Sequence, residues 1–231
     1  MKTATTQRQT LLGVVATVLV IAPAVRPASG GETRMETSVR PDMELKAELD
    51  VGKDALTIRY DVRNRSDKLI YVFDRLTSFE GPLTKVEPEQ AFVLLQGTDA
   101  VRIICALLPK PPLLSIARRP PTYVSVVQPG GTRTGRLQLG LPLIERHPFY
   151  PQIKKEEGKE TRVQRVIFEL GWVEQRPGMK LSEQPSALGT EVDLSGGWGK
   201  PTQWISEMTL SAPGLPVVRH PDPFERPRPV K

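Results

Sequence analysis

Alternation of apolar and polar residues is the main structural signal in this chain. It is clearest over residues 56–63, where every even position is apolar and every odd position is polar. Successive side chains of a β-strand point to opposite faces, so one row should line a core while the other faces solvent. The predicted inner row is Leu56, Ile58, Tyr60 and Val62. Residues 44–49 alternate in the same way and predict a second strand with one wet face.

The segment after residue 63 predicts a turn and then a strand of another kind. Asn64-Arg65-Ser66-Asp67 is rich in side chains that bond nearby backbone groups and stabilise turns. Residues 69–73 are then apolar at every position. We predict a hairpin whose second strand is covered on both faces or paired centrally. Residues 64–66 also match an N-glycosylation sequon, but a turn is needed at this point in any case.

Further strands follow at short intervals, separated by turns rich in Gly, Pro and Asp. Over residues 163–172 the expected inner row ends at Trp172, with Arg165 and Glu169 facing outward. No ten-residue stretch after residue 30 carries a convincing helical stripe. Short strands with such turns are typical of a β-sandwich or barrel. The other predicted strands are Ala91–Gln96, Val101–Leu108, Tyr123–Val127 and Thr134–Leu139.

Three segments are predicted to be irregular. Residues 109–121 hold five prolines, residues 141–161 contain a Pro-Phe-Tyr-Pro sequence and a charged run, and residues 176–231 hold nine prolines. Residues 203–210 could add a strand that returns to the sheet. The predicted fold is therefore all-β, an immunoglobulin-like antiparallel sandwich over residues 42–175. A Pro/Gly-rich extension over residues 176–231 should wrap around it and end in an extended tail.

The N-terminus predicts export. Lys2 and Arg8 precede an apolar run, small residues follow it, and no acidic residue occurs before Glu32. This pattern is typical of a secretory signal peptide over residues 1–30, followed by a flexible lead-in over residues 31–41. We expect a periplasmic or extracellular protein with no membrane span after cleavage. The alternative is a membrane tether formed by an uncleaved N-terminal segment, although the run is shorter than the about 20 residues that a span needs.

The charge argues against nucleic-acid binding, and the cysteine content rules out a disulfide within the chain. Three of the 32 basic residues and none of the 26 acidic residues lie in residues 1–30, which leaves a net charge of +3 on the rest. No basic block interleaved with aromatic residues remains there, so nucleic-acid binding is not expected. The single cysteine, Cys105, cannot form a disulfide within one chain. Its apolar surroundings predict a buried core thiol.

Side chains for catalysis are sparse. The two histidines, His147 and His220, each precede a proline in an irregular segment, and no nucleophile elbow or zinc-binding set is present. Asp61 and Asp74 flank the predicted hairpin without the marks of an acid/base pair. We therefore predict a protein that is not an enzyme and carries no metal or cofactor. An enzyme of another type would need Asp61, His147 and Cys105 to meet in one pocket.

The hairpin region resembles a known group of domains. The pattern Leu56-x-Ile58-x-Tyr60-x-Val62-x-Asn64-x-Ser66-Asp67, followed by Ile70-x-Val72, resembles paired strands of bacterial exported immunoglobulin-like domains. It is also similar to part of the BsuPI-type proteinase-inhibitor domain. The chain lacks the Cys…Trp…Cys set of antibody domains. The resemblance implies a fold and does not by itself imply a function.

Aromatic residues in Pro- and Gly-rich segments are the predicted binding residues. Tryptophan in such a setting can stack on a sugar ring or anchor a protein interface. The main hypothesis is an exported, non-enzymatic binding or structural module of the cell envelope, whose partner is an envelope protein or a polysaccharide. The alternatives are a proteinase inhibitor acting through residues 109–121 and a carbohydrate-binding module. The candidate residues are Phe149, Tyr150, Trp198 and Trp204.

Overall fold

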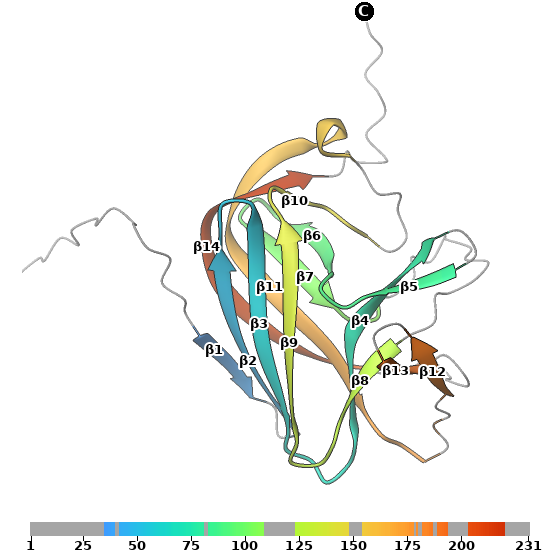
Figure 1. Ribbon diagram of the computed structural model, residues 1–231. Coiled ribbons are helices and arrows are strands. Elements are labelled where there is room, and N and C mark those ends of the chain that lie inside the picture. Colours follow the sequence, from blue (N-terminus) through green and yellow to red (C-terminus); the bar gives the residue numbers. More distant parts are fainter. Residues whose placement is uncertain are drawn as a thin grey trace, which may run out of the picture. The chain divides into compact units, whose positions relative to one another are not determined.

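The regular structure of the chain is almost entirely β, as predicted (Figure 1). The computed structural model describes residues 35–39, 42–80, 83–108, 123–147, 154–177, 179, 182–186, 189–193 and 203–219. One short 3-10 helix, η1 (Lys155–Glu157), is the exception to the strands within these ranges. Phe149, Tyr150, Trp198, the predicted signal peptide and the proline-rich segment 109–121 lie outside the described residues.

The smaller sheet contains the strands with the clearest alternation. Its order is β1 (Met35–Val39), β2 (Met43–Val51), β3 (Ala55–Asn64) and β9 (Thr132–Gly140), and all neighbours are antiparallel. The even positions of β3 are buried and Arg59 and Arg63 are exposed, which confirms the predicted inner row. Residues 35–39 were expected to be a flexible lead-in, and this expectation is wrong because β1 pairs along β2.

The larger sheet is organised around the long strand β11 (Lys159–Glu174). One edge of β11 pairs antiparallel with β14 (Trp204–Arg219). The other edge pairs parallel with β7 (Ala100–Cys105) and then antiparallel with β4 (Ile70–Glu80). The remaining strands are β5 (Leu83–Glu87), β6 (Phe92–Gln96), β8 (Tyr123–Val127), β10 (Leu143–Ile144), β12 (Ser182–Ser186) and β13 (Gly189–Asp193).

Part of the larger sheet closes on itself. β6 pairs with β7, and β10 runs parallel to β14. Val93 of β6 and Arg146, just after β10, exchange backbone hydrogen bonds of 3.0 and 2.8 Å. Strands β14, β11, β7, β6 and β10 therefore form a closed ring of pairings. The parallel pairs correct the prediction of a purely antiparallel sandwich.

The predicted hairpin between residues 56–63 and 69–73 does not form. β3 pairs with β2 and β9 in the smaller sheet, whereas β4 pairs with β11, β8 and β5 in the larger one. Residues 65–69 therefore cross from one sheet to the other. The expectation that residues 69–73 are covered on both faces or paired centrally is confirmed over Ile70 to Phe73, which are all buried, while Leu69 is half-buried.

Asn64 holds this crossing together with its side chain. Its Oδ1 accepts hydrogen bonds of 2.9 Å from the backbone N–H and the hydroxyl of Ser66. Its Nδ2 donates to the carbonyls of Lys68 (2.7 Å) and of Val127 in β8 (3.0 Å). The side chain is fully buried, so the turn interpretation is confirmed and the sequon offers no accessible amide for a glycan.

Two further predictions need correction. Residues 204–219 were assigned mostly to a loose extension, yet β14 pairs with β11 over nearly its whole length and belongs to the core of the larger sheet. Glu169 was expected to face solvent, but its side chain is buried. Its carboxylate accepts hydrogen bonds of 2.5 and 2.7 Å from Arg102 on β7. The neighbouring strand supplies the charge that makes this burial possible.

Candidate functional site

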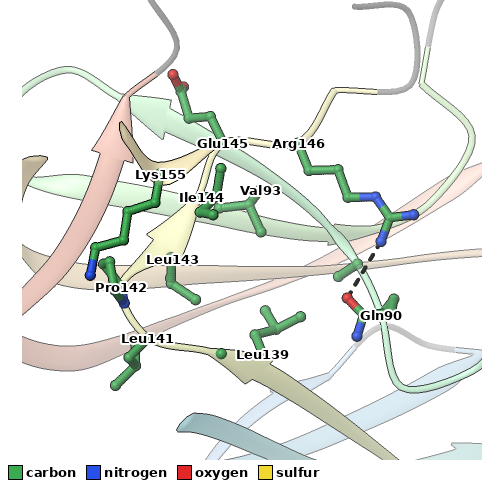
Figure 2. Close-up of a pocket in the computed structure, with 12 residues that line it drawn as sticks. Gln90, Val93, Leu139, Leu141, Pro142, Leu143, Ile144, Glu145, Arg146 and Lys155 are labelled. Carbon is green, nitrogen blue, oxygen red and sulfur yellow. Dashed lines mark hydrogen bonds between the residues drawn. The ribbon is translucent and has the colours of Figure 1, made fainter. Parts of the chain in front are cut away.

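A groove of about 390 Å³ opens where the chain crosses from β9 to β10 (Figure 2). Its walls come from three separate segments: residues 90–93, residues 139–146 and Lys155. Val93, Leu139 and Leu143 form an apolar floor, and these three side chains belong to the main core. The polar rim consists of Gln90, Glu145, Arg146 and Lys155, and Figure 2 shows Lys155 and Arg146 on opposite sides of the floor. We call this cavity the β10 groove.

The backbone of the β10 groove is fixed by hydrogen bonds on both sides. The Leu141 N–H donates to the carbonyl of Asp54 in the β2–β3 turn (2.9 Å). The chain then passes a cis Leu141–Pro142 peptide bond and runs along β14 as β10. The Glu145 N–H donates to the carbonyl of Val218 (3.0 Å). The groove is therefore built on both sheets rather than on a free loop.

Two rim side chains are already held in place. Arg146 donates to the Glu87 carboxylate (2.6 Å) and to the Gln90 side chain (3.4 Å), the second bond being the dashed line in Figure 2. Glu145 accepts a hydrogen bond from the Leu95 N–H (2.8 Å). These bonds preorganise the rim, so a ligand would meet a surface that needs little ordering. Lys155 is exposed and is the cation with the greatest freedom at this rim.

The lining of the β10 groove suits binding better than proton transfer. Glu145 is its one carboxylate, and one of its oxygens is occupied by the β6 backbone. A general base must reach the proton that it removes, which a carboxylate used as a strand partner does poorly. An apolar floor with a few fixed polar groups is the usual composition of a ligand pocket.

Trp204 is the one predicted binding residue that the structure describes. Its side chain is 43% exposed at the start of β14. The ring lies 6.4 Å from the ring of Trp172, tilted by 35°. Trp172 is buried, as predicted, and its Nε1 donates to the Ser206 hydroxyl (3.2 Å). Trp204 therefore rests on a fixed aromatic neighbour and leaves part of its surface open.

The residues considered for chemistry are not brought together at either of the two pockets. Asp61 accepts a hydrogen bond from Thr134 at the surface (2.6 Å), and Cys105 is buried in the core. Burial first, and the negative charge of Asp74 second, raise the pKa of the Cys105 thiol, so it is a poor nucleophile. Burial also lowers the pKa of His147. None of Asp61, His147 and Cys105 lines the β10 groove or the smaller pocket described below.

The sequence predictions missed the β10 groove. Residues 141–161 were expected to be irregular, and their apolar residues carried no strand pattern. A signal was present in Leu139, Leu141 and Leu143, which continue the period-2 apolar row of β9 past its end. The partners Glu87 and Gln90 lie 59 and 56 residues away, and no local pattern connects them to Arg146.

Comparison of the chain with protein-family models, with curated proteins and with solved structures finds no match. In the part of the chain that the structure describes, no helix is long and apolar enough to cross a membrane. The same residues contain no group of three or more His, Cys, Asp or Glu side chains that could hold a metal ion.

Proposed function

We propose that this protein is an exported, non-enzymatic binding module of the cell envelope, with an immunoglobulin-like arrangement of its two sheets. The observation that carries the proposal is the β10 groove, which combines an apolar floor with a rim held by ordered hydrogen bonds. The N-terminal pattern of charged start, apolar run and small-residue exit supports export.

The chemistry of the groove favours a segment of an envelope protein as its ligand. An apolar side chain would replace water over Val93, Leu139 and Leu143, and a groove of about 390 Å³ is large enough for one or two such side chains. Lys155 at the rim would pair with a carboxylate on the same segment. The expected partner therefore presents an apolar residue next to an acidic one.

Binding through the groove is tested with two neighbouring lysines. Lys154 and Lys155 are both exposed, but only Lys155 lines the groove. The full chain, expressed in its source cells, should capture a partner after chemical cross-linking. Lys155→Glu should reduce capture several-fold and Lys154→Glu should leave it unchanged, with both variants folded as judged by thermal unfolding.

Equal capture by both variants, or no partner, would contradict binding at this groove. Export is tested separately by cell fractionation and by the N-terminal sequence of the mature protein. A mature N-terminus near residue 31 in the envelope fraction supports it, whereas an intact chain in the cytoplasm contradicts it.

A polysaccharide is the second candidate ligand, and the exposed face of Trp204 favours it. An aromatic ring held by a buried neighbour is a suitable platform for stacking on a sugar ring. Trp204→Ala should then abolish retention on envelope polysaccharide without unfolding the protein, whereas unchanged retention would remove this candidate. Proteinase inhibition through residues 109–121 stays a prediction, tested with a panel of proteases.

A further inference from the structure

A second cavity, of about 200 Å³, opens between the two sheets and shares no lining residue with the β10 groove. Three strands supply the lining residues considered below: Tyr60 on β3, Asp74 on β4 and Arg133 on β9. Glu89, Thr134 and Arg136 also line it. We call this cavity the Asp74 pocket. Its volume is below the about 300 Å³ of a drug-sized site, so it suits a single ring or one end of a longer molecule.

Asp74 supplies a buried acceptor that is only half used. The residue is 2% exposed, and its Oδ2 accepts a hydrogen bond of 3.2 Å from Nε of Arg133. Its Oδ1 is buried without a hydrogen-bond partner, and Nε of Arg75 lies 4.0 Å from it, beyond hydrogen-bond distance. Buried polar atoms are rarely left without a partner in folded proteins. The described residues supply no donor to Oδ1, so this atom is available to a donor from a bound molecule.

Tyr60 places a hydroxyl group in the same pocket. Its ring packs against Phe168 at a centroid distance of 5.4 Å and crosses directly over Gly135 on β9, where a Cβ would overlap the end of the ring. The Tyr60 hydroxyl has no hydrogen-bond partner among the described residues. Burial first, and the charge of Asp74 second, raise the pKa of Tyr60 well above its usual range, so the hydroxyl keeps its proton. It can therefore both donate and accept.

Arg133 completes a set of complementary groups. Beyond the bond from its Nε, its terminal nitrogens make no hydrogen bond within the described part of the chain, so they are available as donors. Among the lining residues, the charges of Asp74 and Glu89 balance those of Arg133 and Arg136, and Arg75 beside Asp74 adds one positive charge outside the lining. A hydroxyl group donates and accepts at once, and two adjacent hydroxyls could satisfy Asp74, Tyr60 and Arg133 together.

From this arrangement we infer that the Asp74 pocket binds a neutral molecule with adjacent hydroxyl groups, either a free sugar or small polyol or the terminal residue of a glycan. The inference does not depend on the β10 groove and stands even if that groove binds nothing. It also differs from stacking on Trp204, because Trp204 does not line this pocket. The decisive groups are hydrogen-bonding atoms inside the pocket rather than an exposed aromatic face.

Two tyrosines provide a matched pair of variants. The hydroxyl of Tyr71, like Oδ1 of Asp74, is buried without a partner, but Tyr71 lies in a separate cluster with Phe73, Val124 and Val173. Tyr60→Phe removes the hydroxyl from the pocket and keeps the ring against Phe168. Tyr71→Phe removes a buried hydroxyl elsewhere. Any general effect of losing a phenol hydroxyl should therefore appear in both variants.

The experiment is an NMR titration of the full chain that follows the amide resonance of Gly135. The probes are glucose, galactose and mannose, each free and as the terminal residue of a soluble oligosaccharide. Cyclohexanol, guanidinium and phosphate serve as comparison ligands. We expect millimolar or tighter binding of at least one sugar, weakened about fivefold or more by Tyr60→Phe and unchanged in Tyr71→Phe. Tighter binding of the oligosaccharide than of the free sugar would identify the glycan as the source.

Four results would overturn the inference. One is that no sugar shifts the Gly135 resonance at millimolar concentration. The second is that Tyr60→Phe binds as well as the unchanged protein, because the Tyr60 hydroxyl then makes no contact with the sugar. The third is that cyclohexanol competes equally, because adjacent hydroxyls are then not recognised. The fourth is that guanidinium or phosphate binds in place of the sugars, which would make the pocket a site for ions.

Discussion

β3 and β4 follow each other in the chain and have opposite surroundings. The inner row of β3 faces the space between the sheets, while Arg59 and Arg63 on its other face are exposed to solvent. β4 is buried on both faces over Ile70 to Phe73. On its inner side, Ile70 and Val72 join the main core, and on its outer side Tyr71 and Phe73 form a second cluster with Val124 and Val173.

The difference predicts that the second cluster, as well as the core between the sheets, stabilises β4 in its position. Burial of apolar surface is favourable wherever it occurs, and an outer face that packs against side chains of the neighbouring strands β8 and β11 gains as much per unit area as an inner one. The crossing at Asn64 places the two strands in different sheets. The alternating strand β3 can therefore keep one face in solvent, while the apolar strand β4 is buried on both faces. The comparison predicts which faces tolerate substitution.

The largest expected effect is a difference in stability between substitutions on the outer face of β4 and on the outer face of β3. The Phe73 side chain on the outer face of β4 is only 5% exposed. Phe73→Ala removes its ring and leaves a cavity, which should lower the free energy of unfolding by about 3–5 kcal/mol. Arg59→Ala, on the exposed outer face of β3, should change it by less than about 0.5 kcal/mol. Urea unfolding at neutral pH measures both values. Similar small effects in the two variants would show that the second cluster does not stabilise β4.

The crossing between the strands should be the next most sensitive feature. Asn64→Ala leaves the carbonyls of Lys68 and Val127 without their donor and removes the acceptor for Ser66. Loss of buried hydrogen-bond partners should cost about 2–3 kcal/mol. The matched control is Ser66→Ala, which deletes a hydroxyl at the exposed side of the same turn. Equal destabilisation by the two variants would show that the buried contacts of Asn64 contribute little.

The sequence pattern predicted how many faces of each strand are covered, because that depends on the strand's own residues. It did not identify the partner strand. The same Asn-Arg-Ser-Asp signal suits a hairpin turn and a crossing between sheets, and only the bond from Asn64 to Val127 distinguishes them. Glu169 was placed on the outer face of β11 without knowledge that Arg102 covers it there. Such pairings join residues more than sixty positions apart.

The predicted strand over residues 203–210 was shorter than β14, and the reason lies in the local sequence. Pro213, Gly214 and Pro216 break the apolar alternation that begins at Trp204. In the structure the register between β11 and β14 shifts at this point, and Gly214 has a φ of +75°. The interruption is thus a bulge within a continuous strand rather than the end of one. The β10 groove and the Asp74 pocket escaped prediction because each combines separate segments of the chain.

A smaller effect is expected at the contact between β3 and β9. A Cβ at Gly135 would overlap the end of the Tyr60 ring, whose room to move is limited by Phe168. Gly135→Ala should therefore destabilise the protein by about 1–2 kcal/mol. Tyr60→Leu shortens the side chain, so the double variant should show a favourable coupling energy in a thermodynamic cycle. Strict additivity of the two substitutions would contradict a steric conflict between them.

The smallest effect concerns an ion pair that ties the crossing to the smaller sheet. Arg65 donates hydrogen bonds of 3.1 and 2.5 Å to the Glu44 carboxylate on β2. These bonds lower the pKa of Glu44, so the stabilisation is complete above the ordinary glutamate pKa of about 4.3 and is lost as the pH falls through the lowered value. As the pH falls, the unfolded chain binds this proton before the folded protein does, so the stability of the folded protein decreases.

Arg65→Ala should remove this contribution. Between about pH 6 and about pH 3 the unchanged protein should lose slightly more stability than the variant, and the curves should converge at the acidic end. Lys68→Ala is the control, since Lys68 pairs with Glu174 on β11 and not with Glu44. Urea midpoints across this range measure the difference. If Arg65→Ala and Lys68→Ala follow the same pH profile, the Glu44–Arg65 pair does not stabilise the crossing, and Asn64 holds the two strands in their separate sheets without it.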